Sequence, residues 1–477
     1  MTKPLIHPLA MDGKDPSILR GDPIERERYF SREFAKREWD QMWTKIWHIA
    51  GRVNQLQEPG DYVTHNFMRE SVVIALQDDG SMRGFYNACG HRGQRLTWEL
   101  EGSQDAFACP YHGWVWRKDG SLAEVQDPDD FPQGDPCGKL TLKEVRVDTW
   151  AGFIWYTMNP DAPPLLKYLE PMPELYKNYK WDERMVRVRW VRVALDSNWK
   201  FFSDNFNESY HTRTAHPQVP PLIDQDHFTS RYEMYQMGHA RIIQLGRPST
   251  RDLMPKNMPH PFDDRLREWD IDPAAYPDFE TKVVQGWLDL KAAKKRLWKE
   301  RGLYQYEHLT DEELTESPFT FLFPNVAIGG GGGESFGMHR WEPHPTDPEK
   351  CFYDMWTMAY PVGSEYRQRG IHQTLQIKEA PFEFLTYDGG RGQLNIAEQV
   401  TYQDMGLTMG QQAGWNSRGY QEPYLAAQET RVRRFHEVLN DYLAGNPPKP
   451  RSENVTLTNA RAGEAVLKSV TKSAGVP

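Results

Sequence analysis

The 477-residue sequence has only four cysteines, too few for a disulfide framework in a chain of this size. No apolar run approaches the roughly 20 residues needed to span a bilayer, and the first residues lack the apolar core of a signal peptide. Positive charge is not in excess, since 57 Lys and Arg face 67 Asp and Glu. A net charge of −10 argues against a nucleic-acid binder. These absences predict a cytoplasmic protein with neither a membrane nor a nucleic-acid partner.

Two of the cysteines stand in a motif with two histidines. The motif reads Cys89-x-His91, then seventeen residues, then Cys109-x-x-His112. Two thiolates and two imidazoles can hold a binuclear iron–sulfur cluster, with the cysteines on one iron and the histidines on the other. Zinc is the alternative, because the same four side chains suit it. A zinc finger, however, usually pairs Cys with Cys and His with His along the chain. One ligand of each kind in each loop favours a Rieske-type [2Fe–2S] cluster.

The residue pattern divides the chain into three parts, within the two or three domains that its length allows. Residues 1–47 read as an arm rich in Pro and Gly, then a helix whose apolar stripe packs against the C-terminal part. Residues 48–160 contain short β-type runs with Asp-Gly turns, which predict a small antiparallel β domain with both ligand loops at strand ends. Residues 161–477 begin with a proline-rich connector and form the third part.

The third part mixes both kinds of element. A helix is predicted over 201–216, and β structure over 319–400, where aromatic and apolar runs suit a sheet. Residues 220–315 read as irregular and partly helical, and 398–443 as helical.

A second group of candidate ligands lies in the predicted helix. His211 and His216 have four residues between them and fall about one helical turn apart. Two neutral imidazoles and one carboxylate form the facial triad of mononuclear non-haem Fe(II) sites, which leaves coordination positions open. The spacing alone is a weak signal, because two ordinary core or surface histidines would also produce it. It gains weight beside a cluster whose electrons need a destination.

The residues alone do not decide which carboxylate completes this triad. Asp404 is our choice because it opens a helical stretch late in the chain, although an acid at a helix start can simply interact with the helix dipole. Glu208 is the local rival, three residues before His211.

Taken together, the two patterns resemble the large (α) subunit of Rieske non-haem iron oxygenases, the ring-hydroxylating oxygenase family. The resemblance rests on the Cys/His motif and on Asn198-Trp199-Lys200 followed by Asp204-Asn-x-x-Glu-x-Tyr-His-x4-His. It implies an α+β chain: an antiparallel β Rieske domain, then a catalytic domain with a curved antiparallel sheet flanked by helices. It also implies Asp404 as the third iron ligand.

The resemblance gives Glu208 a different role. It matches the carboxylate that links a cluster histidine of one subunit, here His112, to an iron histidine of the next, here His211. Most ring dihydroxylases have Asp at this place, and Glu is more familiar in members that act on methylammonium compounds. Asn205 matches a residue near the iron, and its simpler role is a helix-capping amide. Electron transfer between subunits implies head-to-tail association, as an α3 trimer or as α3β3 with a small β subunit.

The expected reaction uses O2 and electrons from NAD(P)H. The chain has no G-x-G-x-x-G after a predicted strand, so a separate reductase, directly or through a ferredoxin, must supply the electrons. Dihydroxylation of an aromatic substrate is the first expectation, and monooxygenation or N- or O-demethylation of a methylamine or methoxy compound is the alternative. An aromatic cavity lining is expected from six phenylalanines: Phe201, Phe202, Phe206, Phe321, Phe323 and Phe336.

Two other functions fit parts of the pattern. A pure electron carrier would need the cluster but not His211, His216 and Asp404. A zinc-stabilised interaction protein would be colourless, whereas a Rieske protein is red-brown.

Overall fold

The structure is a computed structural model of the chain. It describes residues 8–11, 19–181, 185–227, 229–249, 261–330, 335–362, 365–368, 371–374, 379–390, 396–450 and 458–461. None of the helices within these ranges combines the length and the apolar character that crossing a membrane requires.

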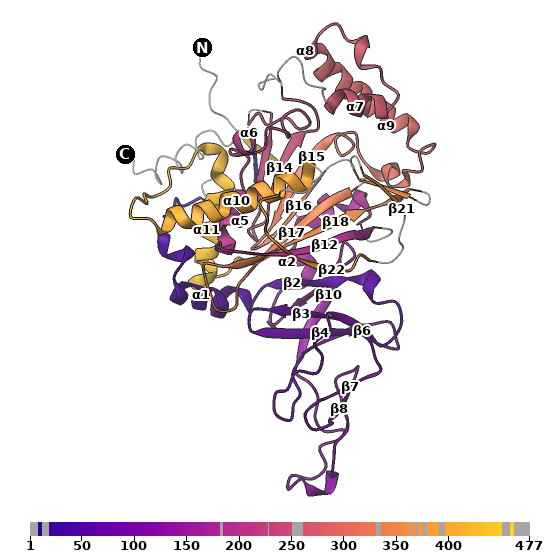
Figure 1. Cartoon of the computed structure of the whole chain (residues 1–477), viewed down its shortest axis with the longest axis vertical. Helices are drawn as coiled ribbons and strands as arrows, with labels where there is room; N and C mark the ends of the chain where they lie inside the picture. Colours follow the sequence, from indigo (N-terminus) through magenta and orange to yellow (C-terminus); the bar gives the residue numbers. More distant parts are fainter. Residues whose placement is uncertain are drawn as a thin grey trace.

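The region after the first helix forms two small antiparallel sheets at the lower end of the molecule (Figure 1). One has the strand order β2-β11-β10-β5-β4-β3-β6, and the other has the order β7-β8-β9. The strands are β2 (Trp47–Arg52), β3 (Asp61–Phe67), β4 (Glu70–Leu76), β5 (Met82–Tyr86), β6 (Glu101–Ser103), β7 (Ala106–Ala108), β8 (Val115–Arg117), β9 (Leu122–Glu124), β10 (Glu144–Trp150) and β11 (Phe153–Thr157). The expected small antiparallel β domain is confirmed.

Strand β4 shows why this region folds as a sheet. Its β-branched residues favour extended backbone, and successive side chains point to opposite faces. Val72 and Ile74 enter one apolar cluster, while Val73 and Ala75 enter the cluster that also contains Cys89 and its neighbours. The ligand loops therefore rest on a packed core.

The rest of the chain is organised around a ten-stranded sheet with the order β22-β12-β18-β17-β16-β15-β14-β13-β1-β23. Its pairings are antiparallel except for β1 with β13 and β12 with β22. The strands are β1 (Pro8–Met11), β12 (Val186–Leu195), β13 (Arg231–Met234), β14 (Ala240–Leu245), β15 (Glu316–Leu322), β16 (Val326–Gly329), β17 (Ser335–Pro343), β18 (Cys351–Ala359), β22 (Phe382–Thr386) and β23 (Thr458–Arg461). A further small sheet contains β19 (Pro361–Val362), β20 (Glu365–Gln368) and β21 (Ile371–Thr374).

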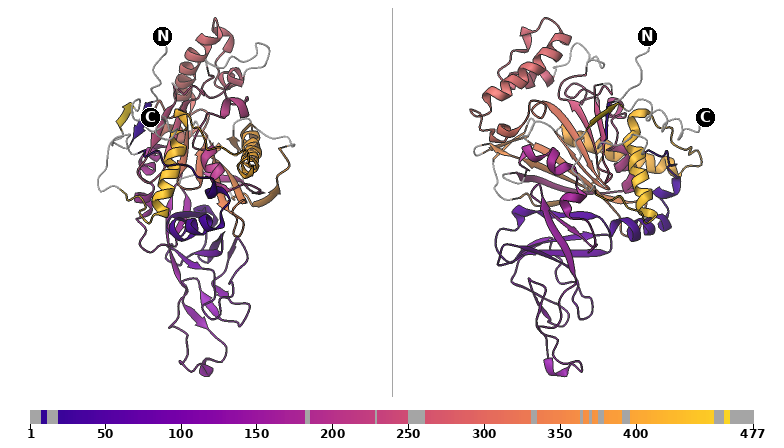
Figure 2. Two further views of the ribbon diagram at one scale, coloured as in Figure 1. Left: turned by 90° about the vertical axis from the view of Figure 1, so that its left-hand side faces the viewer. Right: turned by 180° about the vertical axis from the view of Figure 1, so that it is seen from behind.

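Helices flank the large sheet, as Figures 1 and 2 show. Short α5 contacts strand β17 and both of the long helices, α10 and α11. Helices α7, α8 and α9 gather at the end of the molecule away from the small sheets (Figure 2). The helices are α1 (Arg32–Glu38), α2 (Leu165–Tyr168), α3 (Met172–Leu175), α5 (Trp199–Asn205), α6 (Thr212–Ala215), α7 (Pro261–Glu268), α8 (Phe279–Thr281), α9 (Trp287–Leu297), α10 (Ile396–Asn416) and α11 (Thr430–Leu443).

Several local predictions need correction. The predicted helix over 201–216 is two short helices, α5 and α6, with a turn between them. The segment 220–315, predicted to be irregular and partly helical, contains helices α7, α8 and α9 but also contributes strands β13 and β14 to the large sheet. These two strands pair with each other, and their other partners, β1 and β15, lie far along the chain. Asp404 lies well inside α10 rather than at a helix start. Much of the predicted N-terminal arm lies outside the described residues, although 8–11 form β1.

A buried ionic network joins the two main sheets. His65 of β3 lies 2.8 Å, through Nε2, from Glu342 Oε1 of β17. Arg192 donates to the other Glu342 oxygen at 2.7 Å, and Arg340 donates to Asp354 at 2.6 Å. Burial alone would raise the pKa of Glu342, but the two arginines hold it well below its usual range. The network fixes the orientation of the small sheets relative to the large one.

Candidate functional site

The first candidate ligands lie where helix α5 ends. The Asn198 side chain accepts the backbone N–H of Lys200 and caps α5 at its start. After the helix stops, the Glu208 carboxylate accepts the backbone N–H groups of Tyr210 and His211. Glu208 therefore holds the turn that leads into α6. This local capping places His211 just before α6 and His216 just after it.

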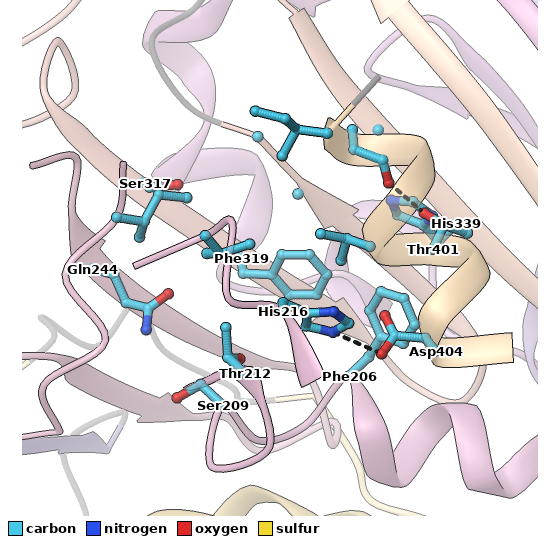
Figure 3. Close-up of a pocket in the computed structure, with 18 of the residues that line it drawn as sticks. Phe206, Ser209, Thr212, His216, Gln244, Ser317, Phe319, His339, Thr401 and Asp404 are labelled. Carbon is cyan, nitrogen blue, oxygen red and sulfur yellow. Dashed lines mark hydrogen bonds and ion pairs between the residues drawn. The ribbon is translucent and has the colours of Figure 1, made fainter. Parts of the chain in front are cut away.

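His211 and His216 meet Asp404, which comes from a distant part of the chain on α10. One ligand atom from each side chain lies within 4.8 Å of the other two. His216 Nε2 is 2.9 Å and His211 Nε2 is 3.5 Å from the same oxygen, Asp404 Oδ1. His216 and Asp404 are buried and face each other in Figure 3. Two imidazole nitrogens and a carboxylate oxygen around one point suit a mononuclear iron.

The Nδ1 atoms of His211 and His216 have hydrogen-bond partners that fix the orientation and the tautomer of each ring. His211 Nδ1 contacts the Glu208 carboxylate, and His216 Nδ1 lies 2.7 Å from Gln403 Oε1. Both partners are hydrogen-bond acceptors here, so each Nδ1 carries the proton. Each Nε2 is then left with its lone pair directed toward Asp404, which is the tautomer that a metal requires. The donor set therefore fits the iron that the sequence predicts.

Nearby carboxylates and amides complete the electrostatics of this centre. Burial alone would lower the pKa of His211, but Glu208 and Asp404 outweigh it and raise the pKa. Asn205 donates its amide to Asp404 Oδ1 at 3.1 Å. The amide thus orients the carboxylate instead of capping a helix.

A cavity of about 330 Å³ opens beside the triad. Its described lining is mostly apolar and includes Phe206, Phe319 and Phe336. The centroids of the Phe206 and Phe319 rings lie 5.4 Å apart, and the ring planes are inclined by 28°. Of the six phenylalanines expected in the lining, Phe206 and Phe336 contribute. The others do not line it and are buried in the core: Phe201, Phe202, Phe321 and Phe323.

The charged groups around the cavity have one sign. None of the described lining residues is lysine or arginine, whereas Glu208, Glu398 and Asp404 are carboxylates. Glu398 is paired with Arg189, which offsets its charge. Polar but uncharged groups, Gln244 and Ser317, lie at the other end of the cavity from Asp404 (Figure 3).

The four residues of the Cys/His motif lie on two loops of matching backbone geometry. Cys89 N–H donates to Gln94 O, and Cys109 N–H donates to Trp114 O in the same way. In each loop a glycine with positive φ, Gly93 at 78° or Gly113 at 69°, donates back to the cysteine carbonyl. Glycine adopts this conformation without the strain of a Cβ.

The matched loops bring the four side chains to one place. The His91 and His112 rings lie 4.6 Å apart, on the solvent side, while Cys89 and Cys109 are buried. Burial raises the pKa of the Cys89 thiol, and the Cys109 thiol is a direct neighbour. Trp116 Nε1 donates to Cys89 Sγ at 3.4 Å. Buried thiols behind two outer imidazoles fit a cluster with one all-cysteine iron and one all-histidine iron.

The two candidate centres lie far apart within one chain. Figure 1 shows β7 and β8, which carry the second ligand loop, at the opposite end of the molecule from α6. The residues on each loop come together as the motif predicts, but the chain does not bring its own His112 near Glu208 or His211.

Three features of the site have little signal in the sequence. Gln403 could have been considered as a neighbour of Asp404, but its contact with His216 depends on how α10 crosses α6. Gln218 donates to the same Gln403 oxygen at 2.8 Å. His339 enters the cavity from β17, and nothing in its local sequence marks it.

Comparison with family models identifies both parts of the chain. Residues 182–445 match "Ring hydroxylating alpha subunit (catalytic domain)", which is more than half of the chain, and residues 46–140 match "Rieske [2Fe-2S] domain".

Relatives include oxygenases of two kinds. The carnitine monooxygenase oxygenase subunit of Escherichia coli (strain K12) is 29% identical over 208 residues, 42% of this chain and 54% of that protein. Choline monooxygenase of Spinacia oleracea is 28% identical over 265 residues, 54% of this chain and 57% of that protein. The large component of the 2,4-dinitrotoluene dioxygenase system of Burkholderia sp. (strain RASC) is 32% identical over 197 residues, 40% of this chain and 44% of that protein. The chain thus spans about half the length of the curated relatives it matches.

Solved structures share the fold. A quaternary ammonium Rieske monooxygenase superposes with a TM-score of 0.62 at 19% identity, over 90% of this chain and 99% of that chain. A mutant of naphthalene 1,2-dioxygenase bound to phenanthrene superposes with a TM-score of 0.59 at 20% identity, over 95% of this chain and 96% of that chain.

Proposed function

The chain belongs to the ring-hydroxylating α subunits of Rieske oxygenases, and we propose that it inserts one atom of O2 into a methylammonium compound. This choice reverses the order expected from the sequence alone, where arene dihydroxylation came first. The division into residues 1–47, 48–160 and 161–477 is part of the proposal.

The observation that carries the proposal is the charge of the cavity. A cationic ligand must lose its hydration, and aromatic faces and carboxylates can replace that hydration. Phe206, Phe319 and Phe336 supply the faces, and no described lining residue is lysine or arginine. Glu208 supplies a negative charge, whereas the charge of Asp404 is offset by the iron that it would hold. An aryl carboxylate would find no cationic partner among these residues. The cavity therefore favours a cation over an anion.

Two further observations support a methylammonium substrate. Glu208 stands where most ring dihydroxylases have Asp, as the family resemblance implies. The carnitine and choline monooxygenases among the relatives are named for methylammonium substrates.

A second candidate is dihydroxylation of a neutral arene. Its support is the mostly apolar lining, together with the 32% identity to the 2,4-dinitrotoluene dioxygenase component.

The chemistry supplied by the bound groups is electron storage at the cluster and O2 activation at the iron. The protein's own contribution is to hold the ligands and shape the cavity. Glu208 and Gln403 keep the protons of His211 and His216 on Nδ1, and Asn205 orients the Asp404 carboxylate. The phenylalanine walls exclude water from the substrate.

Electrons must pass between copies of the chain in this proposal. The large separation of the two centres within one chain supports a head-to-tail assembly, in which Glu208 joins His211 to the partner subunit's His112 (Figure 1). We propose a trimer, with a reductase that uses NAD(P)H as the electron source, either directly or through a ferredoxin. A small β subunit can complete the assembly as α3β3.

A single-turnover reaction tests the proposed reaction. The holoenzyme is reduced chemically and mixed with ¹⁸O2 and either N-methyl cations, such as choline, or neutral arenes, such as naphthalene. One labelled oxygen in the product or released formaldehyde from a cation supports the proposal. Two labelled oxygens in an arene diol contradict it and establish the second candidate. A reducible cluster in a protein that binds no iron would restore the electron-carrier function.

A further inference from the structure

His339 is a polar residue in the cavity wall that the reaction described above does not use. It lies on β17 and lines the cavity, on the same side as Asp404 in Figure 3. In the described part of the chain, the ligand atoms that converge as a possible metal site belong to His211, His216 and Asp404, and His339 is not among them. Burial lowers the pKa of His339 to about 4, so the ring is neutral at neutral pH.

The neighbouring strand determines which ring nitrogen carries the proton. His339 Nδ1 lies 2.8 Å from the hydroxyl of Tyr353 on β18, and Tyr353 is fully buried. The hydroxyl has one proton and no other hydrogen-bond partner among the described residues. Either tautomer leaves one donor without an acceptor in the described part of the protein. If Nδ1 carried the proton, that donor would be the fully buried tyrosine hydroxyl, which water cannot reach, whereas with the proton on Nε2 it is a group at the cavity, where water or a ligand can accept it. Tyr353 therefore donates to Nδ1, and the His339 proton is on Nε2.

The Nε2 edge of the His339 ring lies against Gly337 in the cavity wall. A Cβ atom placed on Gly337 would lie 2.7 Å from His339 Nε2, so only glycine leaves room for the ring edge there. Gly337 itself lines the cavity. The Phe206 ring lies 5.3 Å from the His339 ring. No hydrogen-bond acceptor for this N–H is present among the described residues, which leaves one donor in an apolar wall beside the triad.

We propose that His339 is a specificity-determining residue whose Nε2–H donates a hydrogen bond to an oxygen of the substrate. The oxygen belongs to a hydroxyl or carbonyl group, because Glu208 lines the same cavity and no described lining residue is a lysine or arginine that could pair with a carboxylate. A donor without a protein partner is satisfied when such an oxygen binds and unsatisfied when a methyl group takes its place. The inference rests on the cavity as the substrate site of the proposed function, and it narrows the substrates to oxygen-bearing compounds.

Matched ligand pairs test this role without turnover. Calorimetry on the anaerobic holoenzyme compares choline with propyltrimethylammonium, and 1-indanone with indane, where each second compound lacks the oxygen. In whichever pair binds, we expect the oxygenated member to have a Kd at least about tenfold lower than its partner, which is the affinity ratio that one good hydrogen bond produces. His339→Leu should bring the two members to about equal affinity, while His339→Gln, which keeps an N–H donor, should retain part of the difference.

A control on the neighbouring strand separates a hydrogen bond from packing. Tyr353→Phe leaves His339 in place but removes the donor that fixes its proton on Nε2, so the preference for the oxygenated ligand should weaken. Equal affinities in the wild type, or an unchanged preference in His339→Leu, would overturn the proposal. Loss of iron from that variant would overturn it too, by making His339 a ligand. Binding of the indane pair alone would contradict the methylammonium proposal and still test His339; binding of neither pair contradicts both.

Discussion

Replacing Gln403 by leucine should weaken Fe(II) binding although Gln403 is not a ligand. Its Oε1 accepts the Nδ1 proton of His216 at 2.7 Å, and this contact keeps the ring in the tautomer that offers Nε2 to the metal. Loss of such a partner costs roughly 10- to 100-fold in metal affinity. Because Gln403 is exposed, water can replace part of the lost contact. We therefore expect the lower end, about tenfold or 1.4 kcal/mol.

Two matched variants separate this effect from a general disturbance of α10. Gln403→Glu keeps an acceptor and makes it anionic, which strengthens the His216 ring as a ligand, so iron should bind as tightly as in the wild type or more tightly. Gln218→Leu removes only the second donor to the Gln403 oxygen, at 2.8 Å, and should leave the affinity nearly unchanged.

The assay is an anaerobic competition between the iron-depleted protein, with its cluster intact, and a coloured Fe(II) chelator. Absorbance of the cluster in each variant shows that the rest of the fold is unaffected. Wild-type affinity in Gln403→Leu would refute the reasoning, because it would mean that His216 keeps its tautomer and orientation without the amide.

Three further predictions follow from named contacts. Glu208→Gln should leave both metal centres filled but slow reoxidation of the reduced cluster by O2 and substrate in stopped flow; a wild-type rate would remove its bridging role. Trp116→Phe deletes the N–H donor to Cys89 Sγ at 3.4 Å, which favours the more negative reduced cluster, so the reduction potential in a redox titration should fall. Burial lowers the pKa of His48 from 6.5 to about 3. Between these two pH values the imidazole is protonated in the unfolded chain but not in the folded one. The free energy of unfolding should therefore fall by about 1.4 kcal/mol per pH unit below pH 6.5; urea midpoints should show a shallower slope for His48→Gln.

Local chemistry in the sequence was enough for the ligands that lie close together along the chain. Cys89 with His91, and Cys109 with His112, each sit on one short loop, so their spacing and the nearby glycines determine that both can face one cluster. His211 and His216 are likewise placed by a turn that Glu208 caps. The antiparallel small sheets also follow from local alternation and turn residues. Short-range geometry leaves few arrangements open to such segments.

Contacts between distant segments were decided by the tertiary structure alone. Which carboxylate completes the triad was open from spacing, because Glu208 and Asp404 are both acids within plausible reach, and only the crossing of α10 over α6 brings Asp404 to His216. Strands β13 and β14 pair with each other, but their place in the large sheet depends on β1 and β15, which lie far along the chain. Four of the six phenylalanines expected in the cavity lining do not line it, for a related reason: Phe201 and Phe206 lie on one short segment, yet only Phe206 reaches the cavity. Residue type sets what a side chain can do, whereas packing of distant elements sets what it faces.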